Sequence, residues 1–332
     1  MVNEPLDTER RATEMNEQFF ARTDGPAPGL PRELVGYADN PPRIEWPGGR
    51  KIAVQIVVNY EEGSEKTFPM GDGDNDYLHE LPFKLDDQRD MAVESVYEYG
   101  SRAGIWRLFR VFDAAGVPIT VFGAAVALER NPAVGNKIRK RGDETAAHGY
   151  RWSNGYEMNR EEEAEAIRRA VKSIEQTTGE RPLGWYSREM SVNTRELVVE
   201  EGGFIYDSES YNDDIPYWTD VHGTPHLVVP YSLVVNDCRF VLPQGYSNPN
   251  DLYDFAKCSL DGLRADGDGV ARMMSVGLHA RFSGNPARAD AVARFIDYAQ
   301  QFDDVWFARR IDIARSFIEQ VPAESATFET RS

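Results

Sequence analysis

The sequence predicts an α/β fold in which parallel strands alternate with crossover helices. From residue 50 onward, short apolar runs rich in β-branched residues alternate with longer stretches whose apolar residues recur at helical spacing. Several of the helical stretches stop at a glycine, the residue most common just past a helix end. No short repeat and no linker interrupts this order, so we expect one domain, built as a barrel or as an open sheet.

The expected strands and helices follow each other in strict order along the chain. The first strand, residues 52–58, reads Ile-Ala-Val-Gln-Ile-Val-Val, which is typical of a strand buried on both faces. Further strands are expected at 119–122, 144–147, 183–186, 204–206, 271–278 and 305–307. Amphipathic helices are expected at 102–115, 160–177, 191–201, 248–263, 286–302 and 311–319.

The two ends of the chain depart from this pattern. Residues 1–35 are polar, contain Pro and Gly at 25–29 and show little periodicity, so we expect an N-terminal arm that runs over the surface. Residues 323–332 are expected to form a short C-terminal tail. The folded domain is therefore expected to span residues 36–322.

Composition excludes several classes of protein. The 332 residues are 41% hydrophobic and 11% aromatic, which supports a buried core and excludes wholesale disorder. Lys and Arg number 37 against 55 Asp and Glu, and the resulting net charge of −18 repels nucleic-acid phosphates and anionic lipids. No apolar run approaches the roughly 18 residues of a membrane-spanning helix, and the N-terminus lacks the apolar stretch of a secretory signal. We expect a cytoplasmic protein without nucleic-acid or membrane partners.

Three other patterns indicate no binding site. Cys238 and Cys258 do not form a C-x-x-C pair, so neither a disulfide framework nor a thiolate zinc site is expected. His222 and His226 have the spacing of helical metal ligands, but the Gly-Thr-Pro sequence between them is incompatible with a helix. The acidic segment 71–76 lacks the closing glutamate of a calcium loop, so a solvated loop is expected there.

Polar and aromatic residues follow the ends of most expected strands. They are Glu61 and Glu62 after the first strand, His148, Arg151 and Trp152 after the third, Trp185 and Arg188 after the fourth, Asp207 after the fifth, and His279 after the sixth. Because the carboxyl ends of parallel strands gather at one rim, we expect these side chains to lie close together. Carboxylates, imidazoles and guanidinium groups together can activate water, protonate a leaving nitrogen and stabilise an oxyanion.

Each of these residues also has a structural interpretation. Paired carboxylates such as Glu61 and Glu62 often cap a helix or face solvent, and a single histidine after a strand is more often structural than catalytic. His148 and His279 both follow apolar strands, which favours the catalytic interpretation. Hydrolysis of a carbonyl compound is therefore the chemistry that this set of residues predicts.

Several blocks resemble the polysaccharide deacetylase (NodB-homology) superfamily, and within it the PuuE-type metal-independent allantoinases and cyclic-imide hydrolases. The blocks are Asn-Tyr-Glu-Glu-Gly at 59–63, Glu-Ser-Val-Tyr-Glu-Tyr-Gly-Ser-Arg-Ala-Gly at 94–104, Ala-His-Gly-Tyr-Arg-Trp at 147–152, Glu-Arg-Pro-Leu-Gly-Trp-Tyr at 180–186, Glu-Gly-Gly-Phe-Ile-Tyr-Asp-Ser at 201–208 and Ser-Val-Gly-Leu-His at 275–279. The resemblance covers residues 31–319 and implies a distorted (β/α) barrel of about seven parallel strands. It also implies a homo-oligomer, with a tetramer favoured, and a role in purine catabolism.

The resemblance assigns roles to individual residues. Glu61 stands at the position of the catalytic base, Glu62 at that of the metal carboxylate, and His148 at that of the first metal-binding histidine. Trp152 replaces the second histidine and cannot bind a metal, so no metal and no other cofactor is expected; a metal, if bound, would be a single zinc near Glu62 and His148. His279 matches the acid that protonates the leaving group.

The same comparison suggests how a substrate would be bound. Trp152 and Trp185 are expected to form an apolar slot for a flat ring, with Arg151 or Arg188 near its carbonyl oxygens. Tyr60 and Asp207 are further candidate substrate-binding residues. We also expect burial to raise the pKa of Glu61, as suits a general base.

One segment departs from the allantoinase branch. Residues 187–194 read Ser-Arg-Glu-Met-Ser-Val-Asn-Thr, and Glu189 adds a carboxylate at the expected pocket mouth. Hydrolysis of a C–N bond in a small cyclic ureide or imide is therefore better supported than hydrolysis of allantoin itself. Two alternatives stay open: a metal-dependent carbohydrate N-deacetylase and a non-catalytic relative that binds a small molecule.

Overall fold

The computed structural model describes residues 28–78, 80–243, 245–266 and 269–325. The chain divides into two units, residues 1–36 and 37–332, and the first is described only from residue 28. The expected arm over 1–35 and the expected tail over 323–332 lie largely outside the described residues. Both stay predictions.

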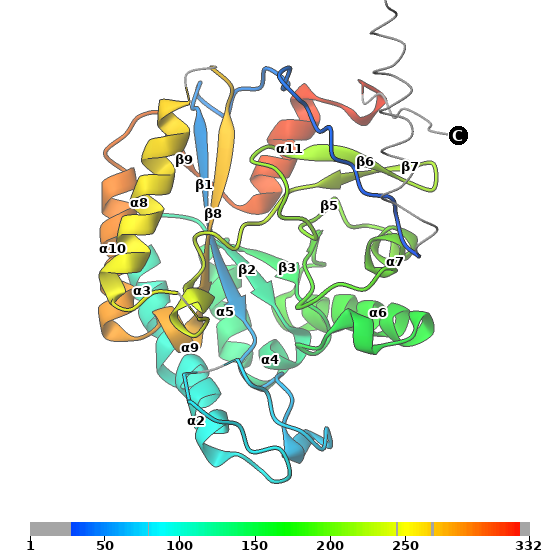
Figure 1. Cartoon of the computed structure of the whole chain (residues 1–332), viewed down its shortest axis with the longest axis vertical. Helices are drawn as coiled ribbons and strands as arrows, with labels where there is room; N and C mark the ends of the chain where they lie inside the picture. The colour runs from blue at the N-terminus through cyan, green and yellow to red at the C-terminus, as the bar shows by residue number, and fades with distance from the viewer. Residues whose placement is uncertain (1–27, 79, 244, 267–268, 326–332) are drawn as a thin grey trace, which may run out of the picture. The chain divides into compact units, whose positions relative to one another are not determined.

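Within the described part of the second unit, nine strands form one curled sheet (Figure 1). They are β1 (Ile52–Tyr60), β2 (Thr120–Gly123), β3 (Glu144–Ala147), β4 (Gly184–Trp185), β5 (Tyr206–Asp207), β6 (Tyr217–Val221), β7 (Thr224–Val228), β8 (Arg272–His279) and β9 (Val305–Phe307). Their order is β6-β7-β5-β4-β3-β2-β1-β8, with β9 paired to β1. Every pairing is parallel except that of β6 with β7. The predicted α/β barrel fold is confirmed, and each expected strand is present.

The β6–β7 hairpin is the part of the sheet that the sequence analysis missed. Its two-residue turn is His222-Gly223, with φ angles of 51° and 85°. Two consecutive positive φ angles define the type I′ turn that suits a hairpin, but the usual Asn-Gly or Asp-Gly signal is absent here. His222 therefore lies in a turn and His226 on a strand, and they do not form the helical pair that metal ligands would need.

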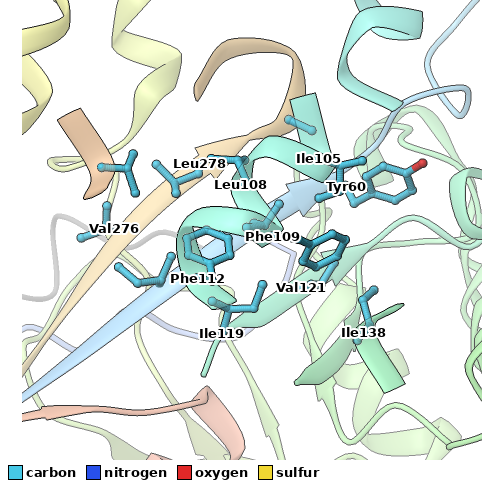
Figure 2. Close-up of a cluster of buried hydrophobic side chains, with 14 of the residues drawn as sticks. Tyr60, Ile105, Leu108, Phe109, Phe112, Ile119, Val121, Ile138, Val276 and Leu278 are labelled. Atoms are coloured by element: carbon cyan, nitrogen blue, oxygen red, sulfur yellow. The ribbon is translucent and has the colours of Figure 1, made fainter. Parts of the chain in front are cut away.

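Strand β1 pairs with three other strands. It pairs with β8 from Ile52 to Asn59, with β9 at its start and with β2 at its end. All nine of its residues are buried. Alternate residues point to opposite faces, so Ile56 and Tyr60 join the main apolar core, whereas Val57 packs in a separate cluster with Phe122 and Tyr186. Figure 2 shows Tyr60 in the main core.

Helices surround the sheet (Figure 1). They are α2 (Met91–Tyr99), α3 (Ile105–Ala115), α4 (Ala125–Arg130), α5 (Pro132–Arg141), α6 (Arg160–Thr178), α7 (Thr194–Glu201), α8 (Pro249–Ala265), α9 (Ala280–Ser283), α10 (Pro286–Ala299) and α11 (Arg310–Gln320). The packing of α10 against α8 and α3 covers one part of the sheet, and that of α6 against α4, α5 and α7 covers another. The predicted helices are confirmed, whereas α2, α4, α5 and α9 were not predicted. No helix in the described ranges has the length and apolar content needed to cross a bilayer.

A π-helical turn, Gly100–Gly104, joins α2 to α3 into one continuous helix. Its glycines allow a close approach to the segment that follows β8. A Cβ atom on Gly100 would lie 2.4 Å from Oε1 of Glu62, and one on Gly104 would lie 2.0 Å from the carbonyl oxygen of Ala280. Because neither glycine has a side chain, the helix can pack closely on Glu62 and on α9.

The guanidinium of Arg310, the first residue of α11, lies inside the curled sheet and is fully buried. It donates to side chains of β1 and β8, namely Gln55 and Ser275 (3.2 Å). On the other side it donates to Ser208 (3.0 Å) and to the carbonyl oxygens of Val229 and Pro230 (2.9 Å), which follow β5 and β7. One side chain thus bridges strands at opposite ends of the sheet order.

We expect Arg310→Met to lower the free energy of unfolding by about 3–5 kcal/mol, because it leaves buried acceptors without donors at nearly unchanged volume. Urea denaturation followed by circular dichroism measures this. The control is Arg309→Met, since Arg309 is 30% exposed and pairs with Asp312 on the same helix. Its loss should cost less than about 1 kcal/mol. Equal effects of the two substitutions would contradict a bridging role for Arg310.

Candidate active site

Four predicted catalytic side chains meet where β1, β3 and β8 end. Glu61 and Glu62 follow β1, His148 follows β3, and His279 is the last residue of β8. The register of the sheet brings them together, because His279 pairs with Asn59 on β1 while β2 links β1 to β3. All four are buried.

Glu61 is the residue that contacts all the others in this cluster. Its Oε1 lies 3.2 Å from Nε2 of His148 and 3.4 Å from Nε2 of His279. Its Oε2 accepts a hydrogen bond of 2.7 Å from Nη1 of Arg281, on α9. Burial alone would raise the pKa of Glu61, but Arg281 and the two histidines hold it well below its usual range. The expectation of a raised pKa is therefore wrong, because it left out the neighbouring positive charge.

Glu62 binds two backbone N–H groups and so fixes the local backbone. One oxygen accepts from the backbone N–H of Arg281 at 3.0 Å, and the other accepts from the backbone N–H of Glu61 at 3.1 Å. Burial raises the pKa of Glu62, an effect that Arg281 opposes and Glu61 strengthens. Glu62 thus connects the end of β1 to α9.

The ring of His148 is fixed by contacts on its face and at its edge. It stacks on Tyr186, with centroids 5.2 Å apart and planes 3° apart. Its Nδ1 lies 2.7 Å from the carbonyl oxygen of Tyr186, which leaves Nε2 directed at Glu61. The ring therefore has little freedom to rotate.

His279 forms a dyad with Asp237, which lies in the 3₁₀ turn η4 (Asp237–Phe240). Nδ1 of His279 donates to Oδ1 of Asp237 at 2.6 Å, and Oδ2 accepts from the backbone N–H groups of His279 (2.7 Å) and Ser283 (3.1 Å). Burial lowers the pKa of His279, but its interactions with Cys238, Glu61 and Asp237 outweigh burial, so the pKa lies well above its usual range. His279 is thus held as an imidazolium that can give up a proton from Nε2.

The sequence analysis selected neither Asp237 nor Arg281. Asp237 lies 42 residues before its partner His279 on an irregular segment, where no periodicity marks it. Arg281 carries a weak signal, because it follows the strand-end histidine by two positions. Its guanidinium packs on Tyr97, Trp152 and Phe282, with its Cζ 4.6, 5.1 and 4.6 Å from their ring centres.

Trp152 and Trp185, which were predicted to form the apolar slot, have different surroundings. Trp152 covers Arg281 on one face and carries the guanidinium of Arg188 on its ring, 3.7 Å from the centroid. Trp185 lines a cavity of about 150 Å³ beside His148. The same cavity is also lined by Arg151, Ser187 and Arg188, but not by Glu61.

Two predicted arginines are engaged by the loop that follows β1. Arg151 forms a two-pronged ion pair with Asp72, at 2.7 Å for both bonds. Arg188 does the same with Asp76, at 2.5 and 3.0 Å. The loop is thereby fastened across Trp152, and neither guanidinium points at Glu61.

Tyr60 and Asp207 do not face the cluster. Tyr60 follows the alternation of β1 into the core, where its hydroxyl lies 2.9 Å from Oγ of Ser101 (Figure 2). Asp207 pairs with Arg195 at 2.7 Å and with His226 at 3.1 Å. Despite its burial, its interactions with Arg195 and His226 hold the pKa of Asp207 well below its usual range. Both residues therefore act on the site only through the structure around it.

The donors present do not fit the zinc site of the typical deacetylases. Both carboxylate oxygens of Glu62 already accept backbone N–H groups, and the Trp152 side chain offers no ligand atom. In the described residues, one group has ligand atoms close enough to share an ion, namely Asp237, Cys238 and His279. The sulfur of Cys238 lies 3.8 and 3.6 Å from the two ring nitrogens of His279. Such near-equal distances place it over the flat face of the ring, away from the in-plane lone pair that a metal would use.

The chain is similar to known proteins along most of its length. The family model for Polysaccharide deacetylase matches residues 86–199. A Schizosaccharomyces pombe protein, whose name assigns it to the polysaccharide deacetylases, is 35% identical over 315 residues, which cover 88% of this chain and 98% of the relative.

Two solved structures are similar in fold and in sequence. A "probable polysaccharide deacetylase" from Pseudomonas aeruginosa PAO1 has 46% identity and a TM-score of 0.85, over 88% of this chain and 99% of the other. The structure of Puue allantoinase has 44% identity and a TM-score of 0.85, over 90% and 99%. This chain therefore belongs to the polysaccharide deacetylase (NodB-homology) superfamily, in its PuuE-type branch.

Proposed function

We propose that this protein hydrolyses a ring C–N bond in a small cyclic ureide or imide by general acid–base catalysis without a metal. The observation that carries the proposal is the contact of 3.4 Å between Oε1 of Glu61 and Nε2 of His279. A proton acceptor and a proton donor are thus held side by side, the donor by Asp237 at 2.6 Å. The 44% identity to Puue allantoinase supports a cyclic ureide as substrate.

Glu61 is the proposed base. It takes one proton from a water molecule, whose oxygen attacks a ring carbonyl while the C=O electron pair moves to the carbonyl oxygen. The low pKa of Glu61 keeps it ionised at neutral pH, so it can accept that proton. His148 directs Nε2 at the same carboxylate oxygen and would help to place the water.

His279 is the proposed acid. When the C–N bond breaks, the electron pair goes to nitrogen, which takes the proton from Nε2 of His279. Glu61 can then return its own proton to His279 across the contact of 3.4 Å, which restores both groups. The raised pKa of His279 keeps its proton in place at neutral pH until the leaving nitrogen needs it.

A carbohydrate N-deacetylase is the second candidate, because relatives at 35% and 46% identity have names that place them among polysaccharide deacetylases. The donor set around Glu62 and Trp152 argues against the metal-dependent form of that reaction. A ring of allantoin size would place the enzyme in purine catabolism, which fits the proposed cytoplasmic location.

We expect metal-stripped protein to open at least one ring among allantoin, hydantoin, dihydrouracil and succinimide, with chelator leaving the rate unchanged. Mass spectrometry detects the gain of one water. An N-acetylglucosamine oligomer in the same panel tests the second candidate. Release of acetate that depends on added zinc, with every ring left intact, would refute the proposed function.

Variants in the same assay test the assignment of roles. Glu61→Gln and His279→Ala should each lower kcat by about 10² or more, the usual scale for general acid–base groups. His222→Ala is the control, since that side chain is 69% exposed and lies in the β6–β7 turn. Near-native turnover by Glu61→Gln would make Glu62 the next candidate base.

The rate should be flat across neutral pH. Because the pKa of Glu61 is lowered from 4.5, kcat/KM should fall only below that pH, where Glu61 gains a proton. Because the pKa of His279 is raised from 6.5, the alkaline fall should lie well above that pH, where His279 loses its proton. A pH–rate profile with circular dichroism at each pH checks this. A fall centred near pH 7 would instead implicate Glu65, whose pKa burial raises to about 7.

A homotetramer is the proposed assembly. Light scattering at micromolar concentration and moderate salt should give about four times the chain mass of 37.5 kDa. The net charge of −18 opposes association, so the mass should not fall when salt is raised. A monomeric mass would refute this proposal.

A further inference from the structure

One edge of the Arg281 guanidinium has no partner. Nη1 donates to Glu61 at 2.7 Å, but Nε and Nη2 are buried and have no hydrogen-bond partner among the described residues. These two nitrogens carry parallel N–H groups on the same side of the guanidinium. Arg195 uses the same edge in this chain to hold both oxygens of Asp207, at 2.7 and 3.1 Å.

The surroundings of Arg281 leave its edges as the only approach. Its Cζ lies 4.6 Å from the ring centres of Tyr97 and Phe282 and 5.1 Å from that of Trp152. Aromatic rings that pack on a guanidinium leave its N–H groups directed outward in the plane. A buried donor without a partner costs about 1–3 kcal/mol, and more when it is charged. Two such donors on one edge indicate that a ligand completes them.

We propose that the Nε–Nη2 edge of Arg281 binds the two oxygens on the reacting carbon and, after ring opening, the product carboxylate. The inference rests on the proposed function and names a residue that the sequence analysis did not select. The substrate carbonyl brings one oxygen, and the attacking water brings the second. When the C–N bond breaks, the nitrogen leaves with the proton from His279 and the same two oxygens form a carboxylic acid. This acid gives its remaining proton to solvent and becomes the carboxylate.

This geometry favours the later states of the reaction over the substrate. A planar ring carbonyl can accept a hydrogen bond from one N–H of the edge. The tetrahedral intermediate and the carboxylate each have two oxygens and can accept from both N–H groups. Interactions that strengthen between substrate and transition state are the ones that raise kcat. Nη1 of the same guanidinium donates to Glu61, so one arginine contacts both the proposed base and the proposed carboxylate site.

If this edge binds carboxylates, the protein should prefer them over neutral amides, and this preference can be measured by binding alone, without turnover. Hydantoate, N-carbamoyl-β-alanine and succinamate are the ring-opened forms of hydantoin, dihydrouracil and succinimide. Wild-type protein should bind at least one of them about tenfold or more tightly than its neutral primary amide, which cannot offer two carboxylate oxygens. Isothermal titration calorimetry measures this on unmodified protein. Failure to bind any of them, or equal binding of carboxylate and amide, would overturn the inference.

The Arg281→Lys variant distinguishes the contribution of the paired N–H groups from that of the positive charge. It keeps the positive charge beside Glu61 but lacks the paired N–H groups. Carboxylate affinity should fall about tenfold or more, while the neutral amides should bind as they do to wild type. On a ring that is hydrolysed, kcat should fall by about 10²–10³ with a smaller change in KM. Arg309→Lys is the control, because Arg309 uses the same edge on Asp312 at 2.7 Å for both bonds.

The outcomes separate this inference from the proposed function. Ring hydrolysis with unchanged kcat and carboxylate affinity in a folded Arg281→Lys protein would overturn the role of Arg281 and leave the function standing. Carboxylate selectivity that is lost in Arg281→Lys, without hydrolysis of any ring, would support the binding site and refute the function. If Arg281→Lys does not fold, the comparison of carboxylate with amide on wild type decides the matter alone.

Discussion

The guanidinium of Arg310 holds the curled sheet together from the inside. The sheet order ends at β6 and at β8, so hydrogen bonds between described strands do not close it into a full barrel. Arg310 supplies a connection across the interior, from Gln55 and Ser275 on one side to Ser208 and the backbone after β7 on the other. Polar atoms that bind one buried cation cannot separate without leaving it unpaired, so the curl is fixed. The curl in turn decides which strand ends face each other.

The site that results is a set of buried charges that balance one another. Glu61 and Asp237 carry the negative charges, while Arg281 and His279 carry the positive ones, and each is at most 4% exposed. Charges in such a dry environment interact far more strongly than in water, which explains why the pKa of Glu61 is lowered although burial alone would raise it. The loop after β1 is fastened over Trp152 by Asp72 and Asp76.

The sequence allowed the strands to be placed because their signal is local. A run such as Ile52–Val58 has one physical explanation, burial on both faces, and the rule that function gathers at strand ends then selected Glu61, His148 and His279. The features that the sequence analysis missed have no local signal in the sequence. Asp237 acts from an irregular segment, and the β6–β7 hairpin turns on His222-Gly223, which few patterns would mark as a type I′ turn.

The pKa of Glu61 could not be predicted for a related reason. Its direction depends on Arg281, a residue 220 positions away that enters the cluster through α9. Helix α9 can do so because Gly100 and Gly104 let the continuous helix of α2 and α3 pass close to Glu62 and to Ala280. The sequence contains those glycines, but the partner that they approach is decided by the tertiary fold. Local patterns thus selected the candidate catalytic residues, and packing decides their protonation.

In the proposed function, Arg281 supplies the positive charge that the family pattern would draw from a metal, and Trp152 packs on it. A catalytic metal supplies positive charge next to a developing oxyanion. Here Trp152, at the position of a metal-binding histidine in the family pattern, packs on Arg281 instead, 5.1 Å from its Cζ. The guanidinium is permanently charged, is shielded from water by three aromatic rings and lies beside the base. Preorganised charge in a water-free site is the largest single source of oxyanion stabilisation in many enzymes, and an arginine can supply it as well as an ion can. The replacement of the histidine by tryptophan is therefore understood best together with the arginine that it covers.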